Sequence, residues 1–182
     1  MRLLKRLVAV TAVLAMSAAN ATVIDFEDLA GDSSLPANYA GLVWGSQWSH
    51  YGFSQFPYTP ASGTQRIYNN DTSGSTDWFK FNGDVVFNGA YFAGRNAAQF
   101  ELYNDGALVF TSLSLSLTDV PTFLASGYSG LVDEVRLNVA NGSFVMDDVT
   151  FSQSSNNVPE PTGIVLLGLG LVALAGIRRK QA

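Results

Sequence analysis

Apolar residues at every second position are the feature that most limits the fold of this chain. Polar and apolar side chains alternate over residues 99–103, and Leu113, Leu115 and Leu117 alternate with serines. A two-residue period with one apolar side predicts half-buried β-strands. Between residues 22 and 157 no stretch has a convincing helical period. We therefore expect an all-β domain.

Turn signals divide this domain into short strands. Asn104-Asp105-Gly106 separates the runs around Phe100 and Val109, and Asn141-Gly142 separates residues 135–139 from 144–151. Asx-Gly pairs adopt the positive φ angles that tight hairpins need. About nine short strands favour a β-sandwich, and among sandwiches a jelly roll. The other expected strands are 22–26, 42–45, 65–68, 78–81 and 84–92, whereas 29–40 and 46–64 have the composition of long loops.

The first 21 residues have the layout of a secretory signal peptide. Arg2, Lys5 and Arg6 give a positive start, residues 7–16 are apolar, and Ala19 and Ala21 form a small-x-small cleavage site. This pattern predicts that residues 1–21 are removed. An uncleaved anchor is the alternative, but the apolar run is too short for a bilayer core of ~30 Å.

The C-terminal 25 residues form a three-part tail after a polar linker at 152–157. Its parts are the motif Val158-Pro159-Glu160-Pro161, an apolar segment at 163–177, and the basic residues Arg178, Arg179 and Lys180. We expect a short hydrophobic helix over 163–177, which is below the ~20 residues of a typical span. After export, the basic end would stay in the cytoplasm.

This layout resembles the PEP-CTERM sorting tail of Gram-negative bacteria. The resemblance implies that residues 158–182 are a sorting signal, and that a membrane-embedded exosortase processes the protein near Pro-Glu-Pro. It also implies export across the inner membrane with a transient or stable C-terminal anchor, followed by a place at the cell surface or in an extracellular matrix. Such proteins are associated with exopolysaccharide and biofilm. A plain tail anchor is the alternative.

Charge and cysteine content exclude several classes of function. The chain has 15 acidic and 10 basic side chains, but six of the basic ones lie in the two terminal signals. Residues 22–157 thus keep 14 acidic and 4 basic side chains, a surface that repels phosphate backbones and makes nucleic acid an unsuitable partner. The chain has no cysteine, which excludes disulfides, zinc–thiolate sites and a thiol nucleophile.

The two ends of the domain carry a second resemblance. Residues 23–28 (VIDFED) open it and residues 144–151 (FVMDDVTF) close it, in a way similar to galactose-binding-like jelly rolls, which include many carbohydrate-binding modules. The resemblance implies adjacent first and last strands and a nearby structural calcium. Carboxylates are suitable ligands for Ca²⁺. The candidate ligands are Glu27, Asp28, Asp147 and Asp148, and solvated acids beside turns are the alternative.

An aromatic segment at 44–58 is the candidate ligand-binding loop. Flat aromatic rings stack on the apolar CH faces of sugars while neighbouring polar groups hold the hydroxyls. The predicted contact residues are Trp48, His50, Tyr51 and Tyr58. The alternative is that the aromatic side chains fill one end of the sandwich, as we expect for Trp44.

The sequence contains few residues in patterns typical of a catalytic site. His50 is the only histidine, and no Gly-x-Ser-x-Gly elbow is present. Glycoside hydrolysis needs two carboxylates across a cleft, and Glu101 and Glu134 alternate with apolar residues, which places them on sheet faces. We therefore expect a non-catalytic exported protein that binds carbohydrate. The alternatives are a self-associating structural surface protein and a glycoside-active enzyme.

Overall fold

The regular structure of the domain consists of β-strands. The computed structural model describes residues 21–70, 77–139 and 143–154, and all elements in these ranges are strands. All the strand pairs are antiparallel. In these ranges no helix is long and apolar enough to cross a bilayer. The predicted signal peptide, apart from Ala21, and the predicted sorting tail lie outside the described residues.

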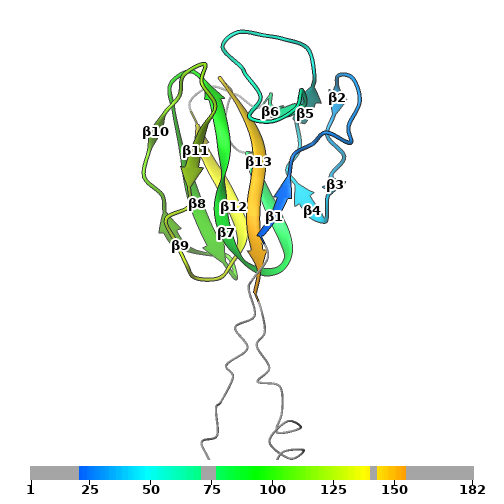
Figure 1. Ribbon diagram of the computed structural model, residues 1–182. Coiled ribbons are helices and arrows are strands. Elements are labelled where there is room, and N and C mark those ends of the chain that lie inside the picture. The colour runs from blue at the N-terminus through cyan, green and yellow to red at the C-terminus, as the bar shows by residue number, and fades with distance from the viewer. Residues whose placement is uncertain (1–20, 71–76, 140–142, 155–182) are drawn as a thin grey trace, which may run out of the picture.

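One long strand, β7 (Trp78–Gly94), belongs to both layers of the sandwich (Figure 1). Its first half pairs with β4 (Leu42–Trp44) and β12 (Val132–Val139). Its second half pairs with β11 (Thr122–Ala125) and β13 (Phe144–Gln153). The hydrogen-bonded ladder therefore continues from one layer into the other through β7.

Shorter strands extend both layers from these pairs. In the β12 layer, β12 also pairs with β8, which in turn pairs with β9 and β10, and β4 pairs with β3. In the β13 layer, β13 also pairs with β1 and β6, and β5 links β6 to the edge strand β2. Their bounds are β1 Ala21–Ile24, β2 Ser33–Ser34, β3 Asn38–Tyr39, β5 Trp48–Tyr51, β6 Arg66–Asn69, β8 Ala97–Asn104, β9 Ala107–Thr111 and β10 Leu115–Ser116.

The core between the layers is rich in aromatic side chains. Phe87 on β7 contacts Phe100 of the β12 layer with ring centroids 4.9 Å apart, and Phe100 contacts Phe92 at 5.6 Å. Phe92 then contacts Phe144 of the β13 layer at 5.9 Å. Offset and edge-to-face ring pairs add stabilisation beyond that of the buried area. This chain of rings fills the sandwich that the sequence predicts.

Several expectations from the sequence are confirmed. The Asn104-Asp105-Gly106 turn joins β8 to β9, with φ angles of 50° at Asp105 and 77° at Gly106. The first and last strands lie side by side, with Ile24 opposite Val149. The fold is all-β and has the two-layered sandwich form of the predicted jelly-roll-like class. The Asn141-Gly142 turn lies outside the described residues.

Other expectations were wrong in instructive ways. The loop predicted at 46–64 contains β5, which has no alternation because Trp48 packs in the main core while Tyr51 packs on the opposite side of its sheet. The loop predicted at 29–40 likewise contains β2 and β3. Residues 78–81 and 84–92 form one strand instead of two. Leu113 is 86% exposed, so the strand expected around it shrinks to β10.

Gly89 on β7 lies where the backbone of β11 approaches closely. Its φ is +145°, and a Cβ atom there would lie 2.2 Å from the carbonyl oxygen of Leu124. We expect Gly89→Ala to lower the free energy of unfolding by roughly 2–4 kcal/mol, because strain and backbone clash add. Urea unfolding of the full-length protein measures it. Gly83→Ala, on the same strand with nothing within 4 Å of its Cβ, is the matched control and should be close to neutral. Equal effects of both substitutions would contradict this reading.

Candidate functional site

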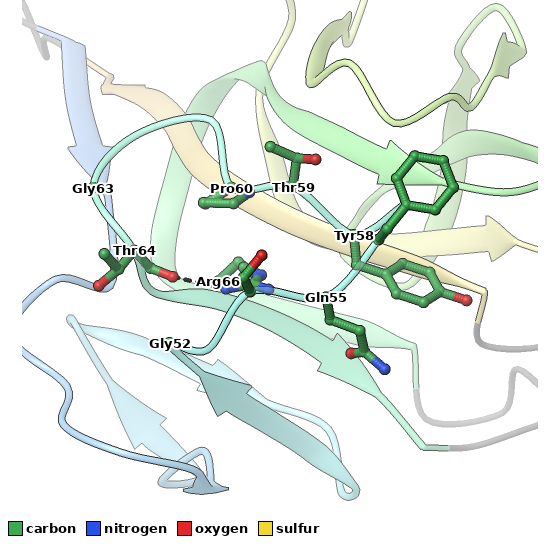
Figure 2. A pocket seen from close by; sticks show the side chains of 10 residues that line it. Gly52, Gln55, Tyr58, Thr59, Pro60, Gly63, Thr64 and Arg66 are labelled. Carbon is green, nitrogen blue, oxygen red and sulfur yellow. Dashed lines mark hydrogen bonds between the residues drawn. The ribbon is translucent and has the colours of Figure 1, made fainter.

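A long loop at residues 52–65 connects two paired strands and forms the candidate site. It leaves β5 after Tyr51 and returns to β6 at Arg66, and these two residues are register partners. The loop therefore starts and ends at the same point of the β13 layer, and its residues in between stand above the sheet (Figure 2). We call it the 52–65 loop.

Two acidic residues of β13 hold one side of this loop. The Asp147 carboxylate is buried, and its Oδ2 accepts hydrogen bonds from the amides of Ala61 at 2.8 Å and Ser62 at 3.1 Å. The Ser62 hydroxyl donates to Asp148 Oδ1 at 2.8 Å. The pairing register shifts after Asp147, and Asp148 has a φ of 47°. An irregularity of this kind redirects side chains from their alternating positions.

Glu27 holds the other side of the loop. It follows β1, and its Oε1 accepts hydrogen bonds from the amides of Thr64 at 2.8 Å and Gln65 at 2.6 Å. Gly63 has no side chain at the place where the Glu27 carboxylate lies, since a Cβ there would be 2.2 Å from Glu27 Cδ. Both anchors satisfy loop amides with carboxyl oxygens, and an ionised carboxylate forms stronger hydrogen bonds than a neutral acceptor.

The four predicted calcium ligands all have hydrogen-bond partners within the protein. Glu27, Asp147 and Asp148 all bind the loop, whereas Asp28 accepts a hydrogen bond from the Tyr39 hydroxyl. In the part of the chain that the structure describes, no three acidic or histidine side chains gather as a potential metal site. The expected four-carboxylate cluster is thus not formed. Calcium binding itself stays a prediction, which melting curves of the protein with and without EDTA would test.

Arg66 closes the neck of the loop. Its guanidinium donates from Nη1 to the carbonyl of Thr64 at 2.9 Å and from Nη2 to the carbonyl of Phe53 at 2.6 Å. The guanidinium also lies over the Tyr51 ring, with its carbon 3.9 Å from the ring centroid. Such a cation–π contact adds to the attachment. The loop is thus fixed at its neck and on both sides.

Two adjoining pockets lie along the loop. The first, which we call the Arg66 pocket, has a volume of about 340 Å³ and is shown in Figure 2; it is lined by Gly52, Ser54, Gln55, Phe56, Tyr58, Thr59, Pro60, Gly63, Thr64 and Arg66. The second, the Tyr68 pocket, has about 300 Å³ and is lined by Tyr51, Phe53, Gln55, Tyr58, Tyr68, Asn70, Phe144 and Val145. Gln55 and Tyr58 line both pockets, so we treat the two as one loop groove.

The aromatic side chains of the groove differ from most of those predicted. Trp48 is only 1% exposed: its ring packs against Trp44 and Phe144, and its Nε1 donates to the Trp78 carbonyl. His50 is also buried, with Nδ1 3.3 Å from Gln65 Oε1. Neither residue lines the loop groove, so both predictions were wrong. The core position of Trp44 agrees with the expectation for that residue.

Tyr51 and Tyr58 do line the groove, and sequence reasoning missed several of their neighbours. Tyr51 is buried as part of the groove floor, and Tyr58 is half-buried. Phe53 and Phe56 belong to the aromatic segment at 44–58 but were not among the predicted contact residues, and they are 53% and 78% exposed. Tyr68, outside that segment, was missed altogether. The sequence Phe56-Pro57-Tyr58 in a loop-like stretch was the available signal. Exposed apolar surface that gathers beside a pocket is typical of a ligand-binding groove or an interaction site.

The two candidate catalytic carboxylates lie away from this groove. Glu134 is buried on β12 and bridges Lys80, at 2.9 Å, and Arg136. These two cations hold the pKa of the Glu134 carboxyl below its usual value, although burial alone would raise it. Glu101 accepts a hydrogen bond from the Tyr103 hydroxyl at 3.0 Å. Neither carboxylate lines the Arg66 or Tyr68 pocket.

Comparison with known proteins identifies the tail. A PEP-CTERM protein-sorting motif matches residues 157–180, which confirms the resemblance of the three-part tail. Such a motif implies export of the protein that carries it. The match covers only this end of the chain, so it assigns a sorting signal and not the domain. No curated protein is detectably similar in sequence.

Among solved structures, the domain is similar to carbohydrate-binding modules of family 29. Two variants of the module CBM29-2, studied for the mechanism of ligand recognition, are each 18% identical with a TM-score of 0.44, and the match covers 79% of this chain and 100% or 99% of theirs. Another structure of a family 29 module is 17% identical with a TM-score of 0.39, and the match covers 78% of this chain and 94% of that module. Similarity at this level assigns no ligand.

Asp147 makes the loop anchor sensitive to pH. Burial, with a smaller contribution from the neighbouring Asp148 charge, raises the pKa of Asp147 to about 7, although three backbone amides oppose the shift. The native state thus binds more protons than the unfolded state between pH about 4 and about 7, so the Asp147 contribution to stability falls as pH rises through that window.

We expect Asp147→Asn to remove this dependence. The free energy of unfolding of the wild type, minus that of the variant, should be larger at pH 5 than at pH 8. The expected change in this difference is on the order of a few kcal/mol, at about 1.36 kcal/mol per pKa unit. Urea unfolding of both full-length proteins at the two pH values measures it. A difference that does not change with pH would contradict the assignment of the titration to Asp147.

Proposed function

We propose that the domain binds a carbohydrate in the loop groove. The observation that carries this proposal is the set of exposed aromatic rings around two joined pockets on an anchored loop. Phe53 and Phe56 present large apolar surfaces to solvent, and Tyr58 and Tyr68 add half-buried rings with hydroxyl groups. Sugar rings offer flat CH faces for such side chains, while Gln55 supplies an amide for hydroxyl groups.

The anchoring of the loop supports binding because it reduces the entropy lost on association. A flexible loop would have to be ordered by the ligand, at a cost of about 0.5–1.5 kcal/mol for each immobilised side chain. Here Asp147, Glu27 and Arg66 already hold the loop backbone. The pocket volumes of about 340 and 300 Å³ lie at the lower end of the range for small-ligand sites, which suits a short stretch of sugar units.

The finer cellular assignment is part of the same proposal. An exported domain that binds polysaccharide would act at the cell surface or in the extracellular matrix, in association with exopolysaccharide and biofilm. The domain would be non-catalytic, since the two glutamates considered for hydrolysis have ionic and hydroxyl partners away from the groove.

A structural role by self-association is the second candidate. The segment between β9 and β11 exposes Leu113 at 86% and Val120 at 63%. Exposed apolar side chains of this kind favour association between copies when they gather into a patch. Sedimentation at several protein concentrations separates the candidates, since oligomers that form without any retention of polysaccharide would favour the structural role.

Phe56→Ala tests carbohydrate binding directly. We expect affinity for a retained polysaccharide to fall roughly three- to tenfold, since loss of one ring contact costs on the order of 1 kcal/mol. Affinity electrophoresis of the full-length protein, with a panel that includes matrix polysaccharide of the producing strain, measures it. Leu113→Ala removes an equally exposed apolar side chain outside the groove and should leave retention unchanged. Retention that is the same in both variants and the wild type would argue against the groove.

The sorting tail yields a separate prediction. If an exosortase-like enzyme processes the protein near Pro159-Glu160-Pro161, the mass of the protein recovered from its host should lack the residues after this motif. Intact-mass spectrometry of the extracellular and membrane fractions measures it. A mass that retains residues 162–182 would instead indicate a stable tail anchor, and a host that lacks the processing enzyme provides the unprocessed control.

A further inference from the structure

A buried guanidinium without an acidic partner lies in the loop groove. Arg66 is 1% exposed. In the described ranges no carboxylate forms an ion pair with it; the ion pairs there join Glu134 to Lys80 and Arg136. Its neighbouring acids have other partners, since the Asp147 and Glu27 carboxylates accept hydrogen bonds from loop amides. Burial of an unpaired charge is costly, so this arrangement needs an explanation.

The hydrogen bonds of Arg66 are incomplete in the described structure. A guanidinium has five N–H donors. Nη1 and Nη2 each donate to a loop carbonyl, and the Tyr51 ring stacks against the group. The Nε atom is buried and has no hydrogen-bond acceptor among the described residues. Unsatisfied buried donors are rare in native proteins, so each one needs an explanation, and a bound acceptor is one.

The position of Arg66 indicates where such an acceptor would come from. Arg66 lines the pocket named after it, and Figure 2 shows it in the middle of the ring of lining residues, with Gly63 and Thr64 on one side and Gln55 and Tyr58 on the other. The Gly63 side is next to the Glu27 carboxylate, which would repel an anion. The Gln55 and Tyr58 side carries no charge and adjoins the Tyr68 pocket.

We infer that the Arg66 pocket takes the carboxylate of an acidic sugar, such as a hexuronate residue of a polysaccharide. The carboxylate accepts hydrogen bonds from the guanidinium, and the sugar ring extends toward Gln55 and Tyr58 and the exposed aromatic rings. Guanidinium and carboxylate match in geometry and charge, which gives stronger hydrogen bonds than a neutral hydroxyl would. This inference rests on the proposed carbohydrate binding and specifies its ligand class.

A comparison of matched polymers tests the inference with the unaltered protein. The probes are polygalacturonate, alginate and hyaluronate, each paired with its carboxyl-reduced neutral form, and the measurement is affinity electrophoresis of the full-length chain. We expect at least one acidic polymer to bind about tenfold more tightly than its reduced form, the effect of one charge-assisted hydrogen bond. Equal binding within every pair would overturn the carboxylate inference and leave carbohydrate binding intact. No binding of any polymer would overturn both.

Substitutions assign the preference to Arg66. Arg66→Gln should abolish the ratio between acidic and reduced polymer, whereas Arg95→Gln makes the same change in net charge at an exposed site and should keep it. If Arg66→Gln does not fold, the Nε–H NMR signal of Arg66 in the wild type replaces it. A shift of this signal on addition of trigalacturonate, and not of the reduced trisaccharide, supports the inference. A ratio that survives in Arg66→Gln, or a signal that does not move, would overturn it.

Discussion

The long strand β7, shared by both layers, is the constraint on which the rest of the structure depends. It supplies hydrogen-bond partners to β4 and β12 in one layer and to β11 and β13 in the other. Its inward side chains, including Phe79, Phe87 and Phe92, contact rings of both layers. A strand shared in this way fixes the two layers relative to each other. Since β13 is held by β7, the acidic residues at the β13 irregularity have a fixed position from which to bind the 52–65 loop.

The buried carboxyl group of Asp147 combines an electrostatic cost with a structural role. Asp147 is buried, which raises its pKa, yet its carboxylate satisfies three backbone amides, two of them in the loop. A water-filled gap between loop and sheet would cost less desolvation but would leave the loop free to move. The observed arrangement costs desolvation energy near neutral pH and attaches the loop backbone to the sheet, which reduces the entropy that a ligand would have to remove on binding.

Sequence reasoning succeeded where one physical signal dominated. Alternation located β8, because one face of that strand is buried, and Asx-Gly chemistry located the turn to β9, because the turn needs positive φ angles. It failed at β5, where Trp48 and Tyr51 are buried on opposite sides of the sheet and the alternation disappears. Trp48, one of the predicted contact residues, is therefore a core residue. Phe53 and Phe56 are on a loop that Asp147 and Glu27, both distant in sequence, help to hold in place, and a local sequence pattern does not show such contacts.

The net negative charge of the domain does not decide what enters the Arg66 pocket. At physiological ionic strength the Debye length is about 8 Å, so exposed acids on distant strands contribute little at the guanidinium. The nearest carboxylates are already engaged by amides, and Glu27 lies toward one end of the pocket only. Long-range repulsion would slow the approach of an acidic polymer, whereas the local guanidinium would stabilise it once bound. Selectivity for an acidic sugar therefore depends on the surroundings of one buried side chain, which overall composition does not reveal.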